Sequence, residues 1–283
     1  MSEGEPTPWR ARASRLVGRV ARSPASRWLI PWFRWQYGIV LDEVEPPAHG
    51  YQSLQQFFCR PLRSAARPIC PDAEALVSPV DGTLSQFGRL RRGELLQAKG
   101  RTYTLTALLG DGERAQQFEG GCYCTVYLAP CDYHRVHAPA AGLVREARYI
   151  PGAHWPVNQR AVDEVEGLFT VNERLITYLD SPLGNLALVL VGACLVGGIR
   201  VNFDPPWNAG PGPHTADRRR YDPAPGFTAG QELGRFEFGS TVILLAAPAR
   251  SWEMNVSAGS RVRMGERLMR AAGPPETDPP GGC

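Results

Sequence analysis

Lysine is almost absent from this chain of 283 residues. Lys99 is the only lysine, and all the other basic side chains are arginines. Pyridoxal enzymes hold their cofactor on a lysine, so only Lys99 could serve here and pyridoxal chemistry is disfavoured. The net charge is +3, which is too small to indicate nucleic acid as a partner.

Long hydrophobic runs are also missing. The longest, residues 186–199, has 14 residues and contains three glycines, whereas a membrane-spanning helix needs about 20 apolar residues. We interpret the run as a buried strand pair or strand-turn. The sequence therefore predicts a soluble or peripheral protein and not an integral membrane protein.

Cysteine does not follow the pattern of a disulfide-stabilised secreted domain. The chain has seven cysteines, an odd number, and its N-terminus shows no secretory signal. We expect reduced thiols in a cytosolic setting.

Residues 1–45 have a composition of their own. Between Pro6 and Leu41 there are seven arginines and no acidic residue, and four of the seven tryptophans lie here. On a helix over residues 9–22, arginines gather within an arc of roughly 80°, opposite apolar side chains. This pattern is typical of a helix in a membrane interface, and residues 28–35 add tryptophans suited to the head-group zone. Two alternatives stay open: a helix docked on its own domain, and an organelle transit peptide.

Residues 46–270 predict one mainly β domain. A linker rich in proline and glycine opens at Pro46, and short apolar strands then alternate with turns. The clearest strands are 124–128, 143–150, 186–191 and 241–245. We predict an α+β fold, mainly β, with an antiparallel sandwich- or barrel-like core and N-terminal amphipathic helices. Residues 204–230 predict a long surface loop, and residues 271–283 a disordered tail.

The segment Phe238-Gly239-Ser240-Thr241 stands directly before an apolar strand. In most proteins such a Gly-Ser pair is an ordinary turn. The alternative is that the serine hydroxyl attacks the carbonyl of Gly239 and converts the amide into an ester. Glycine permits the sharp bend that this attack needs, and the serine also needs a base.

Two of the five histidines, His134 and His137, lie only three residues apart. They could be ordinary histidines, or they could form a metal site with the cysteines at positions 122, 124 and 131. The spacing lacks the two separated ligand pairs of a zinc site, so we predict no metal. Asp81, which precedes Gly82, reads as a turn residue or as the carboxylate of an Asp-His-Ser relay.

Together these segments resemble the phosphatidylserine decarboxylase family over roughly residues 50–265. The resemblance is carried by the order and spacing of residues 57–63, 67–69, 79–82, 96–100, 132–137, 157–158, 172–174, 191–193 and 234–241. The family's processing motif is more often Leu-Gly-Ser-Thr, and here Phe238 takes the first position. The Gly-Ser pair itself is kept.

The resemblance implies a self-cleaving enzyme. Asp81, His137 and Ser240 would form the processing relay, with His137 as the base and Asp81 orienting its imidazole. Cleavage between Gly239 and Ser240 would give a β chain of residues 1–239 and an α chain of residues 240–283. Ser240 would become a covalent pyruvoyl group, which takes up the amine of phosphatidylserine in a Schiff base and draws electrons as carbon dioxide leaves. His134 would return a proton to the product, phosphatidylethanolamine.

The same resemblance implies partners and a location. We expect peripheral attachment to an anionic membrane containing phosphatidylserine, on the cytoplasmic side of the cell membrane, and no nucleic acid partner. The α and β chains of one precursor would stay together, and a homodimer is left open. The family type is the bacterial membrane-associated one, although the sequence pattern alone does not distinguish a bacterial from a mitochondrial membrane.

Two other classes of function remain at this point. A Ser-His-Asp lipid hydrolase would stay one chain, and the sequence has no Gly-x-Ser-x-Gly elbow for it. A non-catalytic lipid-binding module would need only the N-terminal helix, and it gives Asp81, His137 and Ser240 no role. Within the decarboxylase class, the substrate could also be a soluble or differently acylated serine ester.

Overall fold

A computed structural model describes residues 17–98, 101–193, 198–205, 208–209, 216–237 and 239–273. The helix expected over residues 9–22 lies mostly outside these ranges, but residues 17–22 are helical. Most of the tail expected at 271–283 and the first motif residue, Phe238, also lie outside them.

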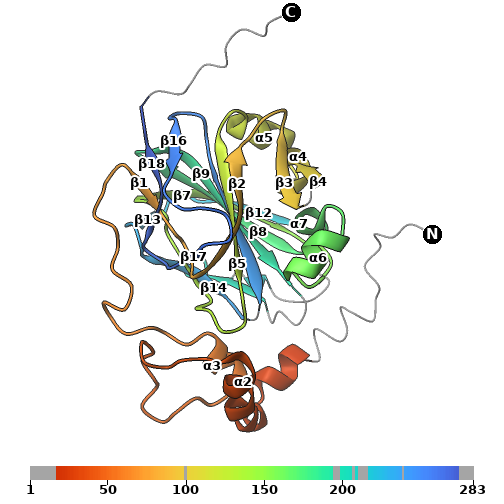
Figure 1. The fold of residues 1–283 in the computed structure, drawn as a ribbon, viewed down its shortest axis with the longest axis vertical. Helices are drawn as coiled ribbons and strands as arrows, with labels where there is room; N and C mark the ends of the chain where they lie inside the picture. The colour runs from red at the N-terminus through yellow and green to blue at the C-terminus, as the bar shows by residue number, and fades with distance from the viewer. Residues whose placement is uncertain are drawn as a thin grey trace, which may run out of the picture.

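The centre of the molecule is a nine-stranded antiparallel sheet (Figure 1). Its main path runs β12 (Asp217–Arg220), β7 (Gly142–Ile150), β8 (Arg174–Ser181), β9 (Gly184–Gly192), β15 (Ser240–Ala246), β5 (Cys122–Leu128), β2 (Gly82–Arg89) and β17 (Arg261–Val262), and β13 (Gly226–Phe227) pairs with β7. In the part of the chain that is described, β12 and β17 end the path without pairing to each other. The sheet is therefore open and does not close into a barrel.

Three smaller sheets accompany the large one. One contains β1 (Ala75–Val77), β18 (Arg267–Ala271) and β16 (Trp252–Met254). The second contains β11 (Asn208–Ala209), β10 (Ile199–Val201), β14 (Glu232–Phe236) and β6 (Arg135–His137). The third is the pair β3 (Glu94–Ala98) and β4 (Arg101–Thr104).

The large sheet buries both of its faces, as β15 illustrates. All seven residues of β15 are buried. Val242 and Leu244 point into a core shared with the small sheets, whereas Ile243 and Leu245 point into a core shared with the helices. This alternation is the period of two expected of a strand. The predicted mainly β, sandwich-like α+β fold is confirmed.

The helices are short, and most begin at a polar cap. They are η1 (Pro24–Leu29), α2 (Ile30–Tyr37), α3 (Leu54–Phe58), α4 (Leu105–Leu109), α5 (Gly112–Phe118), α6 (Gln159–Glu164) and α7 (Leu168–Val171). Side chains of Ser23, Ser53, Thr104, Asp111 and Asn158 accept hydrogen bonds from the first turns. Within the described ranges, no helix has the length and apolar character needed to cross a membrane.

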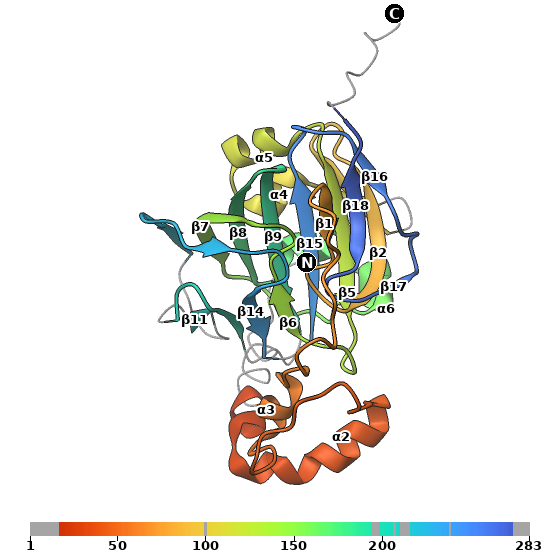
Figure 2. The same cartoon turned by 90° about the vertical axis from the view of Figure 1, so that its left-hand side faces the viewer.

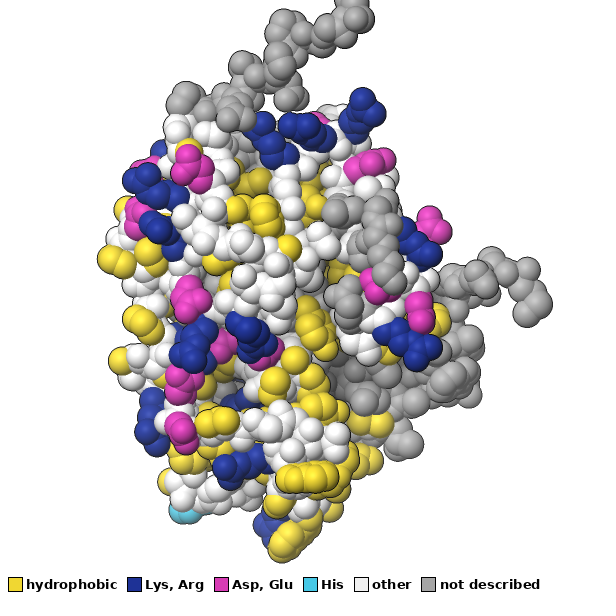
Figure 3. Space-filling view, in the orientation of Figure 1, with side chains coloured by type: hydrophobic (Ala, Val, Ile, Leu, Met, Phe, Trp, Pro, Cys, Tyr) yellow, Lys and Arg dark blue, Asp and Glu magenta, His cyan; other side chains and the backbone are white. Residues whose placement is uncertain are grey.

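The N-terminal helices form one end of the molecule. Figures 1 and 2 show α2 and α3 below the strands, and in Figure 2 the nearest labelled strands are β6 and β14. Phe33 of α2 packs edge-on against Phe57 and Phe58 of α3, with ring centroids 6.4 and 6.3 Å apart. Hydrophobic and arginine side chains are both exposed at this end (Figure 3).

The four strands read from the sequence are all present, as β5, β7, β9 and β15. The long surface loop expected at 204–230 is wrong in its described parts, which contain β11, β12 and β13. In β12, four polar residues pair with β7, and Arg218 binds the buried Glu146 at 2.8 Å. Charge pairing along β7 offsets a composition that by itself disfavours a strand.

Candidate active site

Ser240 lies on a central strand of the large sheet, at the end of the sheet where several strands begin or end. It is the first residue of β15, and it pairs with Leu128 at the end of β5 and with Gly192 at the end of β9. Its side chain is fully buried, and its Oγ has no hydrogen-bond partner among the residues that the structure describes. A buried hydroxyl without a partner costs free energy, so this serine is held in a position that folding alone does not favour.

His137 lies on β6 with both ring nitrogens occupied. Its Nδ1 is 2.8 Å from the carbonyl oxygen of Gly230, and its Nε2 is 3.0 Å from the hydroxyl of Tyr133. Since a carbonyl can only accept, Nδ1 carries the proton and Nε2 accepts from Tyr133. Burial lowers the pKa of His137, so the ring is neutral at physiological pH and Nε2 has the lone pair that a base needs.

His134 has one nitrogen without a partner. The ring is fully buried, stacks on Phe58 at 4.0 Å between centroids, and donates from Nε2 to the carbonyl of Ala129 at 3.0 Å. Nδ1 is buried without a hydrogen-bond partner. Burial, helped by the positive charge of Arg60, lowers the pKa of His134 to about 3. The neutral ring therefore presents Nδ1 as a proton acceptor.

Asp81 is bound by an arginine and not by a histidine. Both oxygens of its buried carboxylate accept from Arg67, at 2.5 to 3.1 Å, and Oδ1 also accepts the backbone N–H of Met264 at 2.8 Å. Arg67 reaches further to Glu43 at 2.7 Å. Such a bidentate, charge-assisted pair fixes a carboxylate firmly.

The structure brings the four predicted residues into one region without linking them by hydrogen bonds. The backbone N–H of His137 donates to Pro79 at 2.8 Å, so the segment before Asp81 runs beside β6, and the charge of Asp81 acts on the imidazole. The Nδ1 position that a relay gives to Asp81 is filled by Gly230. The Nε2 position that it gives to Ser240 is filled by Tyr133.

The cysteines near the histidines lie mostly in the core. Every cysteine in the described ranges is free, and Cys122 and Cys124 are buried side chains of β5. Burial raises the pKa of both thiols, that of Cys124 to about 12. Among the residues that the structure describes, no three His, Cys, Asp or Glu side chains form a group that could hold a metal ion.

Comparison with known proteins gives the same family over the same residues. The family model described as "Phosphatidylserine decarboxylase" matches residues 54–270. The chain is 47% identical over 269 residues to the phosphatidylserine decarboxylase proenzyme of Anaeromyxobacter sp. (strain K), covering 92% of this chain and 94% of that protein. The proenzymes of Brevibacillus brevis and Myxococcus xanthus are 41% and 42% identical, covering 90% of this chain and 92% of each relative.

This chain belongs to the phosphatidylserine decarboxylase family.

The match to the phosphatidylserine decarboxylase family extends from α3 to β18 and so includes Asp81, His134, His137 and Ser240. It therefore also includes the Gly239–Ser240 bond, where β15 begins. The helical residues before α3 precede the family match, but alignment with the relatives covers about nine-tenths of the chain.

Three further contacts of this decarboxylase-family site were not predicted from the sequence. Arg67 and Tyr133 lie inside segments that carry the family resemblance, so their residue types were visible but their partners were not. The third contact is made by the backbone carbonyl of Gly230. A backbone carbonyl is present at every residue, so no sequence signal could have identified it.

Proposed function

We propose that this protein is the proenzyme of a phosphatidylserine decarboxylase, which cuts itself between Gly239 and Ser240 and then converts phosphatidylserine into phosphatidylethanolamine. The observation that carries the proposal is the buried, unpartnered Oγ of Ser240 at the first position of β15, directly after Gly239. It occurs in a chain whose relatives are named proenzymes.

Self-cleavage uses the chain's own groups. Oγ of Ser240 attacks the carbonyl carbon of Gly239, and the Ser240 nitrogen leaves and takes up a proton, which turns the amide into an ester. Loss of the Cα proton of Ser240 then breaks the ester bond, frees Gly239 as the carboxyl end of chain 1–239 and leaves dehydroalanine at position 240. Water hydrolyses this residue: its oxygen becomes the ketone oxygen, and the nitrogen leaves as ammonia. A Cβ built at Gly239 would meet no atom within 4 Å, so the space around this residue is open to the bend that the attack requires.

His137 is the base that we assign to this step. Its lowered pKa keeps Nε2 unprotonated, as proton removal from Ser240 requires. The Tyr133 hydroxyl must leave Nε2 before Ser240 can take its place. Gly230 holds the tautomer, and Asp81, fixed by Arg67, favours the protonated ring through its charge.

The residues present fit a pyruvoyl group formed from Ser240, because position 240 is buried and its own polar atom is unpartnered. Once formed, that group supplies a ketone that takes up the lipid amine and draws electrons as carbon dioxide leaves. His134 moves protons in this step. Its free Nδ1 accepts a proton from the lipid ammonium and returns one to the carbon that has lost carbon dioxide.

The lipid substrate also suggests where the protein works. We propose that it attaches peripherally to the cytoplasmic side of an anionic cell membrane, with the exposed N-terminal tryptophans and arginines toward the lipid. The α and β chains of one precursor remain together, because β15 of the α chain is paired on both sides with strands of the β chain.

The experiment is intact mass and a denaturing gel of the purified protein. We expect two chains, 1–239 and 240–283, the smaller with a blocked N-terminus, and release of carbon dioxide from phosphatidylserine. Ser240→Ala should remain one chain, because no hydroxyl can attack. A wild-type chain that stays whole and hydrolyses lipid would indicate a Ser-His-Asp hydrolase. A whole chain that only binds lipid would indicate a binding module. Either outcome refutes the proposal.

A further inference from the structure

Three arginines lie in a row across three neighbouring strands. Arg200 of β10 pairs directly with Arg235 of β14, and Arg235 pairs directly with Arg135 of β6. Directly opposed residues of antiparallel strands project from the same face, with Cβ atoms about 4.5–5.5 Å apart, and like charges in such pairs are destabilising. The fold therefore places three like charges side by side on one face of this sheet.

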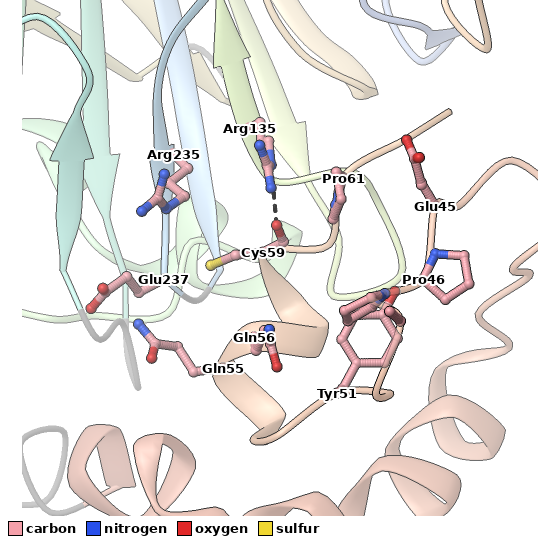
Figure 4. A pocket seen from close by; sticks show the side chains of 12 residues that line it. Glu45, Pro46, Tyr51, Gln55, Gln56, Cys59, Pro61, Arg135, Arg235 and Glu237 are labelled. Carbon is pink, nitrogen blue, oxygen red and sulfur yellow. Dashed lines mark hydrogen bonds between the residues drawn. The ribbon is translucent and has the colours of Figure 1, made fainter. Parts of the chain in front are cut away.

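This arginine row faces two adjoining cavities. One has a volume of about 640 Å³ and is lined by residues that include Arg135, Arg235, Tyr51 and Glu237. The other, about 500 Å³, is lined by Arg200, Arg235 and Glu237 among others. Figure 4 shows Arg135 and Arg235 on neighbouring strands, with Arg135 donating to the backbone carbonyl of Cys59 at 3.1 Å. The hydroxyl of Tyr51 is buried without a hydrogen-bond partner.

The carboxylates nearby do not balance the row. Glu237 binds Arg200 at 2.8 Å and also Arg22 from the N-terminal segment at 2.6 Å. Glu232 binds Arg135 at 2.7 Å, but its distance to Arg235 is 3.7 Å. Among these four ion pairs, that of Arg235 is the longest, and Glu232 is held more closely by Arg135. The Arg235 guanidinium has donors available for an anion.

The arginine row is next to the proposed reaction site. Arg135 and His137 are two residues apart on β6, so their side chains project from the same face of that strand. Glu237 directly precedes the cleavage segment, Arg235 comes two residues before Glu237, and both line the two cavities. A group bound by Arg235 would therefore lie beside the residues that perform the chemistry.

We propose that the arginine row, with Arg235 as its principal donor, binds the phosphodiester of the substrate's head group. This inference rests on the proposed function, and it assigns the arginines to the phosphate and not to the serine carboxylate. The carboxylate must leave as neutral carbon dioxide, and an arginine that paired with it would stabilise the ground state and slow its loss. The phosphodiester keeps its charge throughout the reaction, and arginine donors match phosphate oxygens in a bidentate manner.

Binding is tested on the Ser240→Ala precursor, so that the result does not depend on activity. The probe is glycerophosphoethanolamine, which carries the phosphodiester and no carboxylate, titrated by calorimetry. We expect Arg235→Gln to weaken its binding about tenfold or more, because a charge-assisted pair is lost. Arg235→Lys should recover part of the affinity. Arg145→Gln, which replaces an exposed arginine on β7 paired with Asp180, should bind as the parent does.

Two comparison ligands identify the group that is recognised. L-Serine has the carboxylate and amine without a phosphate, and its binding should not depend on Arg235. Inorganic phosphate should bind more weakly than glycerophosphoethanolamine. The proposal is overturned if Arg235→Gln leaves glycerophosphoethanolamine binding unchanged, or if the variant weakens only serine. Equal binding of inorganic phosphate would overturn the lipid head group as the source of the anion.

Turnover provides the second readout. With the active chain and short-chain phosphatidylserine below its micelle concentration, Arg235→Gln should cut itself normally and raise KM about tenfold while kcat changes little. An unchanged KM would overturn the arginine site even though cleavage and decarboxylation proceed. Conversely, the wild-type chain could fail to cut itself while the Ser240→Ala chain still binds the phosphodiester through Arg235. That result would refute the proposed function but not the arginine site.

Discussion

His134 and His137 are three residues apart, yet their acceptor nitrogens have different surroundings. The Nε2 acceptor of His137 is taken by Tyr133, whereas the Nδ1 acceptor of His134 is unpartnered. Both rings are buried and have a lowered pKa, so both start neutral. Each can therefore serve as a base, and only their different positions assign them to different steps.

Substituting the two histidines separately should impair two different steps, self-cleavage and decarboxylation. His137→Ala removes the base for Ser240, so uncut precursor should accumulate. His134→Ala should still cut, at least in part, but the mature enzyme should release carbon dioxide about 10²–10⁴-fold more slowly, because one proton-transfer group is lost. A gel and a carbon dioxide assay on each purified variant measure the two steps.

The reverse pattern, with His134→Ala uncut and His137→Ala processed, would exchange the two roles. Normal behaviour of both variants would mean that the pair is structural. Asp81→Asn should impair cutting in the same direction as His137→Ala. It also leaves Arg67 without its main anion, and breaking a buried pair costs about 3–5 kcal/mol. Its folding must therefore be checked before its cutting is interpreted.

Residue types were easier to predict than residue contacts. Asp81, His134, His137 and Ser240 were found from spacing and family resemblance, and all four are buried. Their partners were not foreseen, because the Gly230 carbonyl and the Arg67 guanidinium reach the site through folding and not through adjacency in sequence. The Asp81–His137 contact stays a prediction.

At the scale of elements, Ser240 is positioned by the ends of the neighbouring strands. β15 begins at Ser240 between the ends of β5 and β9, and β2 begins nearby at Gly82, which pairs with Val262 of β17. Gly192 and Gly82 thus belong to strands that end or begin at the same end of the sheet as Ser240. Such a row of strand ends can tolerate a cut before β15 because the ladder on either side of that strand remains.

A substitution at Gly82 tests how tightly the strand ends around Ser240 are packed. A Cβ at position 82 would lie 2.4 Å from the backbone oxygen of Tyr127, so β2 or β5 would have to shift. Gly82→Ala in the Ser240→Ala precursor should lower the free energy of unfolding by about 1–3 kcal/mol. Urea denaturation followed by circular dichroism measures this change.

Gly192→Ala is the matched control at the same end of the sheet. Its Cβ would meet the nearest atoms, those of Glu173, at 3.4 Å, an ordinary contact. We expect its stability to stay within about 0.5 kcal/mol of the parent, or to rise slightly. Equal stability of both variants would show that the strand ends are loosely packed and do not position Ser240.

The strands were predictable for a physical reason. Continuous apolar runs such as 241–245 are buried on both faces, and few other structures accommodate them. The short helices α4 to α7 were not foreseen because four to seven residues are too few to show a helical period. Strand β12 was missed because its residues are polar and depend on ion pairs with β7.

At the scale of the whole molecule, the N-terminal helices do two things at once. Phe33 and Ser26 face inward, and Ser26 accepts the backbone N–H of Leu54 at 2.9 Å. Trp28, Trp32 and Trp35 are 75%, 55% and 77% exposed. An inward-facing docked side and an exposed tryptophan side are thus combined in η1 and α2, whereas the helix over residues 9–22, for which the sequence presented docking and membrane contact as alternatives, lies mostly outside the described residues. Deleting residues 1–35 would damage the docked side, so substitutions test the membrane side more cleanly.

The exposed tryptophans should determine binding to lipid. Trp28 of η1 and Trp32 and Trp35 of the adjoining α2 are all exposed. Arg27 and Arg34 are exposed in the same segment. Replacing all three tryptophans by serine should weaken binding to phosphatidylserine-containing vesicles at least about tenfold, because burying one large apolar side chain contributes about 1.5–3 kcal/mol. Vesicle sedimentation of the Ser240→Ala precursor measures binding without turnover.

Added salt and a distant hydrophobic substitution distinguish the contributions of the arginines and the tryptophans to vesicle binding. Raising the ionic strength should weaken binding of the parent further, because salt screens the attraction between arginines and anionic lipid. Leu143→Ser, an exposed apolar position on β7, should bind as the parent does. If the tryptophan variant sediments with vesicles as well as the parent, the tryptophan face does not contact the membrane. The enzyme would then have to meet its lipid through another surface, and the arginine row beside the cleavage segment would be the first place to look.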